Sequence, residues 1–158
     1  MIRNKAAVQG EEGRNEQVKA KEYLQQLSRL NVIIRQKMQE KADLSSSYSS
    51  IGSTDTSKER VSGGAAAGNA GYTRTVDRLI DLEKEIDREI DQYADLKHTI
   101  INQIQALPDP QHVDLLYQRY VKECTFEQIA VNMNYSIRNV YNLHGQALQS
   151  FQVMYNNA

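Results

Sequence analysis

The feature that most constrains this fold is a run of apolar residues at alternating three- and four-residue steps within residues 74–107. Eight of the ten positions on this spacing are apolar, and they continue for more than four heptads between charged flanks, which is typical of a coiled-coil helix. The positions are Val76, Leu79, Glu83, Ile86, Ile90, Tyr93, Lys97, Ile100, Ile104 and Leu107. Pro108 and Pro110 then end the helix, because proline lacks a backbone N–H and disfavours helix in the residue before it.

Residues 16–44 predict a second long helix with a similar stripe. Lys37 and Lys41 fill two of its places, because their alkyl stems can cover apolar surface while their charges reach water. The stripe residues are Tyr23, Leu27, Leu30, Ile34 and Leu44. Residues 14–44 carry seven basic and four acidic residues, whereas residues 72–107 carry five and eight. These opposite charges predict that the two helices pair as an antiparallel hairpin within the chain, with pairing to a second subunit as the alternative.

Between these helices, residues 45–71 predict a disordered linker. Ser, Thr, Gly and Ala make up 19 of the 27 residues, so there is little to bury. The stretch "GGAAAGNAG" suggests a phosphate-binding loop, but it lacks the Lys-Ser/Thr pair and follows no strand. The acidic run "DLEKEIDREID" is interpreted as a solvated, salt-bridged flank of the coil in preference to cation ligands or paired catalytic carboxylates.

The composition excludes several classes of protein. No apolar run approaches the roughly 20 residues of a membrane span, and the first residues contain no apolar stretch that would form a secretory signal. Cys124 is the only cysteine, which fits a reducing cytoplasm. The three histidines lie in different segments without metal-ligand or triad spacing, so we expect no metal, no cofactor and no enzymatic activity. Cys124 is better explained as a structural thiol than as a nucleophile.

The C-terminal part, residues 108–158, predicts three helices. Thr125 and Gln128 form the capping-box pattern before "FEQIAVNM". Asn134 tolerates the left-handed turn conformation, and Ser136 caps the next helix. Small Ala130 allows a close helix crossing, with apolar residues wedged around it. This spacing predicts a helix-turn-helix.

The last helix has two faces on a helical wheel. The expected core face holds Ile137, Val140, Leu143, His144, Ala147, Phe151 and Met154. The opposite face holds Arg138, Asn142, Gly145 and Gln149, flanked by Asn139 and Gln146. Hydrogen-bonding side chains about one turn apart can reach base edges in a major groove, although any surface helix is polar outside.

The stretch "LYQRYVKECTFEQIAVNMNYSIRNVYNLHGQALQSF" resembles region 4 of bacterial sigma factors. More closely, it resembles a phage and prophage family of small regulators akin to the ArpU and RinA late-gene transcription regulators. The resemblance covers about residues 18–152, and the C-terminal third is the most specific. Its motif residues here are Arg119, Tyr120, Thr125 to Ala130, Tyr135, Ser136, Arg138, Val140, Tyr141, His144, Ala147 and Leu148.

This resemblance implies an all-helical, non-enzymatic transcriptional regulator in the cytoplasm of a bacterial host. It implies double-stranded DNA as the partner, with Ser136, Arg138, Asn139, Tyr141 and Asn142 at the DNA, and we add Gln146 from the helical wheel. Relatives often carry a basic residue where this chain has Asn142, so affinity for phosphates is expected to be low. A homo-oligomer formed through the coil, or docking on bacterial RNA polymerase, could compensate.

The sequence therefore predicts an all-α chain in three parts. Residues 1–15 form a flexible N-terminus, 16–107 a coiled-coil hairpin (helix 16–44, linker 45–71, helix 74–107), and 108–158 a helix-turn-helix module. The chain has a net charge of −1 and shows no basic patch of the kind usual in DNA-binding domains. The alternative function is therefore a non-enzymatic coiled-coil interaction or assembly protein, such as a phage packaging or scaffold component, with a structural helix-turn-helix.

Overall fold

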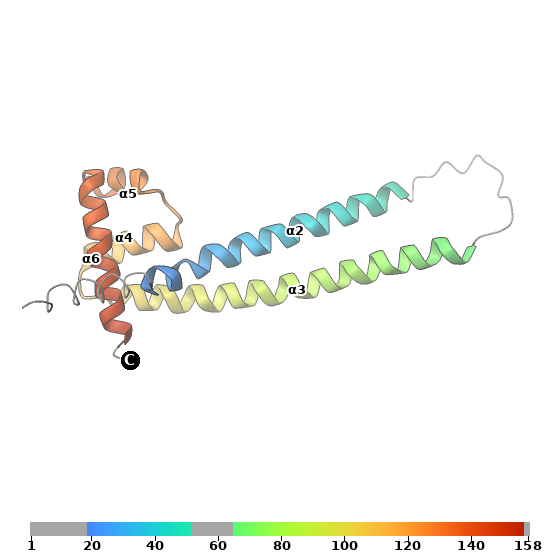
Figure 1. Cartoon of the computed structure of the whole chain (residues 1–158), viewed down its shortest axis with the longest axis horizontal. Helices are drawn as coiled ribbons and strands as arrows, with labels where there is room; N and C mark the ends of the chain where they lie inside the picture. The colour runs from blue at the N-terminus through green and yellow to red at the C-terminus, as the bar shows by residue number, and fades with distance from the viewer. Residues whose placement is uncertain (1–18, 52–64, 157–158) are drawn as a thin grey trace, which may run out of the picture. The chain divides into compact units, whose positions relative to one another are not determined.

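The computed structural model of the chain describes residues 19–51 and 65–156 (Figure 1). These residues form helices and contain no strand, so the predicted all-α class is confirmed for the part of the chain that the structure describes. None of the described helices has a stretch long and apolar enough to cross a membrane. The predicted flexible N-terminus, 1–15, and residues 52–64 of the predicted linker lie outside the described residues.

Residues 19–24 form a short helical stretch, and a turn at Gln25 leads into α2 (Gln26–Ile51). The other helices are α3 (Ala65–Gln105), α4 (Pro110–Leu116), the π-helical turn η1 (Tyr117–Val121), α5 (Phe126–Met133) and α6 (Ile137–Asn156). They form two compact units, one of Leu30–Gln92 and one of Met1–Arg29 with Tyr93–Ala158. We call their described parts the helix pair (30–51 and 65–92) and the C-terminal unit (19–29 and 93–156).

Both long helices extend into the predicted linker, which is a correction to the interval 45–71. Helix α2 continues to Ile51, and α3 begins at Ala65. Ser46 and Ser47 each donate a side-chain hydrogen bond to the Asp43 carbonyl, at 3.0 and 2.9 Å, so their hydroxyls are satisfied inside the helix. The run of alanine at the start of α3 has the highest helix propensity. Low hydrophobicity therefore did not prevent helix formation here.

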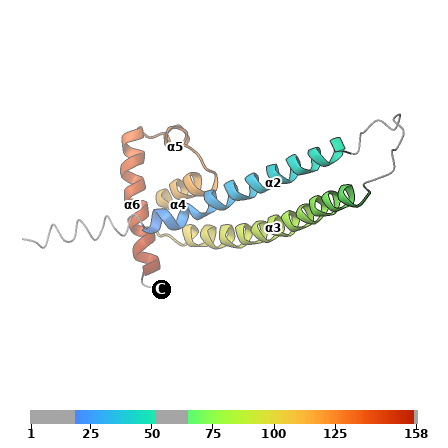
Figure 2. The same ribbon diagram turned by 45° about the vertical axis from the view of Figure 1, so that its right-hand side comes forward.

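Within the helix pair, α2 and α3 lie side by side and antiparallel (Figure 1 and Figure 2). Ile34, Leu82 and Ile86 are buried between them. Leu82 takes the place that the heptad spacing assigned to Glu83, and Ile90 is 39% exposed. An α-helix of 3.6 residues per turn drifts from a strict 3.5-residue repeat, which moves the buried line around α3.

Ion pairs also join the two helices of the pair. Lys37 Nζ lies 3.1 Å from Glu85 Oε2 and also pairs with Glu89. Lys41 Nζ lies 2.9 Å from Glu83 Oε1. These contacts link basic side chains of α2 to acidic side chains of α3, as the opposite charges of the two segments predicted.

The C-terminal unit is larger than the predicted module of residues 108–158, because residues 19–29 and 93–107 pack into the same core. Tyr23 donates to Gln103 Oε1 at 2.8 Å, and the Tyr155 hydroxyl donates to the Gln103 carbonyl at 2.9 Å. The buried cluster consists of Ala20, Leu24, Leu27, Ile100, Ile104, Leu107, Leu115, Leu116, Tyr120, Ile129, Val140, Leu143, Ala147, Leu148 and Phe151. Nearly all of these side chains are apolar, so their burial is the main stabilising term of the unit.

The helix ends in this unit carry the capping box and the left-handed turn that the sequence predicts, and one cap at Asp109 that it does not. Asp109 accepts a hydrogen bond from the Gln111 N–H at 2.9 Å at the start of α4. Thr125 and Gln128 form the reciprocal capping box of α5. Asn134 ends α5 in the left-handed conformation, with φ 55° and ψ 44°. Glu123 has φ 58° as well, a left-handed residue that no sequence signal indicated.

The left-handed residue at the end of α5 gives the first testable prediction. Asn134→Ala should lower the free energy of unfolding by about 1 kcal/mol, because a Cβ without a polar side chain is strained at positive φ. Asn134→Gly should stay within about 0.5 kcal/mol of the wild type, because glycine adopts this conformation without strain. Urea denaturation followed by circular dichroism measures both. Equal destabilisation by the two substitutions would contradict the conformational explanation.

Candidate nucleic-acid interface

A short turn with defined geometry connects α5 to α6. The Tyr135 N–H donates to the Ala130 carbonyl at 2.9 Å, which closes the end of α5. Ser136 then caps α6, because its hydroxyl accepts a hydrogen bond from the Asn139 N–H at 3.2 Å. Ile129 of α5 and Val140 of α6 are fully buried on the inner sides of the two helices. The direction in which α6 leaves the turn is therefore set by hydrogen bonds and by packing.

Every residue predicted at the DNA is exposed. They are Ser136, Arg138, Asn139, Tyr141, Asn142 and Gln146. Arg138, Asn142 and Gly145 follow one another at steps of four and three residues, so they form one line along α6 over roughly 10 Å. The structure thus brings the predicted residues together on the outer side of one helix, where contact with DNA stays a prediction.

The inner side of α6 differs from the predicted core face at both ends. Ile137 is 42% exposed and Met154 is 39% exposed, although both were assigned to the core. Leu148 and Gln152 are buried, although neither was assigned to it. The reason is that the packing partners of the second half of α6 include Tyr23 and the end of α3, which approach it from a direction the local sequence does not specify.

Tyr141 packs against Phe126, which in turn contacts Arg119. Its ring centroid lies 4.6 Å from that of Phe126 at the start of α5. The Arg119 guanidinium lies 4.6 Å from the centroid of Phe126, and its Nη1 donates to the Cys124 carbonyl at 2.8 Å. A guanidinium over an aromatic face is electrostatically attracted to it. The stack therefore holds half-exposed Tyr141 and one cation close together.

The position of Arg119 at this face was not predicted from the sequence. The resemblance contained Arg119 only as half of an Arg-Tyr pair, with no role assigned. The one sequence feature that could have indicated a contact for Arg119 was Phe126 at the first position of α5, because an aromatic side chain next to a polar cap needs a packing partner. The partner is distant along the chain from Tyr141 and comes close only through the fold.

His144 is partly buried on the inner side of α6, as its place between Val140 and Ala147 predicts. Tyr120 Oη and His144 Nε2 share a hydrogen bond of 3.0 Å, and the two rings are stacked. Burial lowers the pKa of His144 from 6.5 to about 4, with smaller contributions from Arg119 and Lys21, so the imidazole is neutral at pH 7. Burial also raises the pKa of Tyr120 to about 12. The pair is a hydrogen-bonded part of the core.

The depressed pKa of His144 predicts acid sensitivity. Because the folded state binds this proton less readily than the unfolded state, the contribution is present above pH 6.5 and is lost as pH falls toward 4, by up to roughly 3 kcal/mol. His144→Gln should therefore lose less stability between pH 7 and pH 4 than the wild type. Urea denaturation at both pH values tests this.

Exposed His98 provides the control for this experiment. Its ring shares a hydrogen-bond contact of 3.1 Å with Asn102 on the same helix. His98→Gln should keep the wild-type difference in stability between pH 7 and pH 4. If His144→Gln and the wild type lose stability in parallel, the buried imidazole does not cause the acid sensitivity.

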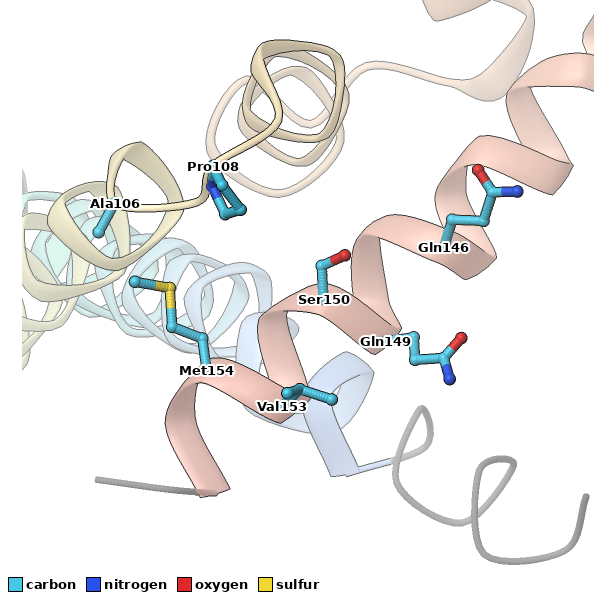
Figure 3. Close-up of a pocket in the computed structure, with 7 residues that line it drawn as sticks. All are labelled: Ala106, Pro108, Gln146, Gln149, Ser150, Val153 and Met154. Atoms are coloured by element: carbon cyan, nitrogen blue, oxygen red, sulfur yellow. The ribbon is translucent and has the colours of Figure 1, made fainter. Parts of the chain in front are cut away.

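The second half of α6 borders an open groove of about 630 Å³ (Figure 3). The side chain of Met154 extends toward Ala106 there, and Pro108 lies on the same wall. The lining is Ala106, Pro108, Gln146, Gln149, Ser150, Val153 and Met154. Gln146 therefore borders this groove as well as the exposed side of α6. None of the lining residues is charged or has a side chain that commonly acts in acid-base catalysis.

Among residues 19–51 and 65–156, no group of three or more His, Cys, Asp and Glu side chains could hold a metal ion. Cys124 is partly buried and unpaired by any disulfide. The space beside the Gly145 Cα is open, because a Cβ added there would meet no atom within 4 Å. The surface of α6 near Gly145 therefore leaves room for close approach by another molecule.

Comparison with known proteins gives no match of any kind. No protein-family model matches the chain, and it matches no curated protein and no solved structure.

Proposed function

We propose that the chain is a sequence-specific DNA-binding transcription regulator that reads the major groove with α6. In this proposal α5, the turn at 134–136 and α6 form a helix-turn-helix of the sigma region 4 type. The helix pair is a coiled-coil hairpin attached to it. The protein acts without enzymatic activity.

The observation that carries the proposal is the line of exposed polar side chains on α6, directly after the capped turn. Arg138 can make paired hydrogen bonds to guanine O6 and N7, and Asn142 can make them to adenine N6 and N7. Ser136 and Asn139 lie at the start of the helix, where side chains and backbone N–H groups of recognition helices contact phosphates and bases. Tyr141, packed on Phe126, adds a rigid apolar and hydrogen-bonding group beside them.

The resemblance to phage and prophage late-gene regulators supports a regulator of phage or prophage genes in the bacterial cytoplasm. Bacterial RNA polymerase is then the natural second partner, because sigma region 4 modules act there. Contact with polymerase would also supply affinity that the DNA face by itself lacks. Arg138 is the single Lys or Arg of α6, and Glu127 carries a negative charge on α5.

Removal of the two base-reading side chains tests the proposal. Wild-type protein should shift DNA from the promoter region of its own gene cluster at low salt. Arg138→Ala with Asn142→Ala should weaken this binding at least about tenfold, because each paired contact is worth roughly 1–3 kcal/mol. Fluorescence anisotropy with labelled DNA at about 50 mM salt gives the dissociation constants.

The chain offers a matched control on α3. Arg74→Ala with Asn102→Ala also removes one exposed cation and one exposed amide, and should leave DNA affinity within about twofold of the wild type. If both double variants bind equally well, or if the wild type binds no DNA at any salt concentration, α6 is not a recognition helix.

Because α6 has few cations, adding one is expected to increase DNA affinity. Asn142→Arg should strengthen binding to mixed-sequence DNA several-fold and make the slope of log K against log salt more negative by about 1, because one more phosphate is neutralised. Asn142→Gln changes the same side chain without charge and should leave the slope unchanged. A salt titration from about 50 to 200 mM compares them. An unchanged slope for Asn142→Arg would place position 142 away from the DNA.

The second candidate function is an interaction or assembly protein in which the coil is the working part. The ion pairs between α2 and α3 and the near-neutral charge of the chain favour it. In that case the α5–α6 module serves packing, and the Arg138 and Asn142 substitutions change no DNA affinity. The DNA experiment therefore separates the two functions.

A further inference from the structure

Three exposed apolar residues lie on one side of the helix pair, whereas exposed Val32 and Ile33 lie on other sides of α2. Met38 of α2 is 48% exposed, and Ile80 and Ile90 of α3 are 44% and 39% exposed. At about 100° per residue, Met38 lies about 40° from buried Ile34, and Ile90 lies about 40° from buried Ile86. Both therefore lie at the edge of the buried line. Ile80 is turned further out, about 120° from Ile86 in the same direction.

The ion pairs formed by Lys37 and Arg78 lie on the other side of the helix pair. Lys37 contacts Glu85 and Glu89, and Arg78 Nη2 lies 3.0 Å from Glu40 Oε1. Arg78 is about 160° around α3 from Ile80, and Lys37 is about 100° around α2 from Met38. The ion pairs of Lys37 and Arg78 therefore lie across the buried line from Met38, Ile80 and Ile90.

Exposed charged residues also lie on the apolar side: one is Glu83 of α3, which pairs with Lys41, and two more are Arg35 and Asp87. Arg35 lies about 60° from Met38 on α2, and Asp87 lies between Ile80 and Ile90 on α3. Both are exposed, and neither forms an ion pair within residues 19–51 and 65–156. The α2 edge of this side is thus basic and the α3 edge is acidic.

We propose that a second copy of the chain docks on this side, so that two helix pairs form an antiparallel four-helix bundle. A two-fold axis parallel to the helices places α2 of one copy over α3 of the other. The basic edge of each copy then faces the acidic edge of its partner, and the exposed apolar residues of both copies meet at the centre. A two-fold axis across the helices would instead place basic α2 against basic α2.

The alignment of α2 with α3 within one chain shows which charged residues of two copies would lie opposite each other. Lys41 pairs with Glu83, and Lys37 pairs with Glu89, so Arg35 of α2 is level with about residue 89 of α3. Rotation about an axis parallel to the helices preserves this level. Arg35 of one copy therefore lies about half a turn along the helix from Asp87 of the other, within reach of its long side chain.

The available area is sufficient for a dimer of moderate stability. Helices about 30 Å long, with a pair width of about 20 Å, offer roughly 600 Å² on each copy. Two such faces bury about 1,200 Å², at the lower end of specific interfaces. Burial of Met38, Ile80 and Ile90 removes apolar surface that a monomer leaves in water. This dimer forms without DNA and so goes beyond the proposed function, although it would give the assembly two copies of α6.

Sedimentation equilibrium of the full chain without DNA tests the inference. The wild type should show twice the chain mass of 18.0 kDa at about 50 μM. Met38→Glu with Ile80→Glu should raise the dimer dissociation constant at least about tenfold, because charges would be buried without partners. Val32→Glu is the matched control, since Val32 is 42% exposed on α2 but about 160° from Ile34. It should leave the dimer intact.

A charge exchange tests the orientation separately from apolar burial. Arg35→Glu and Asp87→Arg should each weaken the dimer about three- to tenfold, and their combination in one chain should restore it. Circular dichroism confirms that each variant keeps its helices. A monomeric wild type, or equal loss of dimer in Val32→Glu and Met38→Glu with Ile80→Glu, would overturn the inference. Failure of the combined variant to restore the dimer would overturn the proposed orientation. DNA affinity enters none of these results.

Discussion

Burial of the inner side of α6 is the interaction on which the arrangement of the C-terminal unit depends. Val140, Leu143, Ala147 and Phe151 are withdrawn from water into a core shared with residues 19–29 and the end of α3. Because these contacts occupy one side of the helix along most of its length, the polar residues between them must point outward. The candidate interface is therefore a consequence of core packing. Any change that rotates α6 would bury Arg138 or Asn142 and expose apolar surface, at a cost of several kcal/mol.

The electrostatics of the unit follow the same division between inside and outside. The interior accepts His144 because its imidazole is neutral and hydrogen-bonded to Tyr120. The exterior of α6 carries one cation, Arg138, and a second cation, Arg119, lies over Phe126 beside Tyr141. In the proposed function, this low charge means that additional subunits or a protein partner would add to DNA affinity. It also means that hydrogen bonds to bases would contribute a larger share of affinity than is usual, with a correspondingly weak dependence on salt.

Local features of the fold could be predicted because they depend on neighbouring residues. The capping box at Thr125, the left-handed turn at Asn134, the cap at Ser136 and the break at Pro108 are all formed by side chains within a few positions of their partners. The interior position of His144 followed from the period of the helix. Wheel geometry also placed Arg138 and Asn142 on the exposed side, because 3.6-residue periodicity is a property of the helix itself.

Features that depend on distant residues could not be predicted in this way. The ends of α2 and α3 were misplaced because serine- and alanine-rich segments are compatible with both linker and helix. The exposure of Ile137 and Met154, the burial of Leu148 and Gln152, and the contact of Arg119 with Phe126 all depend on which segments pack against α6. The inclusion of residues 19–29 in the C-terminal unit is of the same kind.

The sequence by itself thus determined the helical class, the caps and turn that separate α5 from α6, and the opposite charges of the two long helices. These follow from spacing and from the backbone preferences of single residues. Only the tertiary structure decided which apolar residues are covered, where the compact units divide, and which apolar residues of the helix pair remain exposed. The physical reason is that burial is a property of pairs of surfaces, and the second surface of each pair lies far away along the chain.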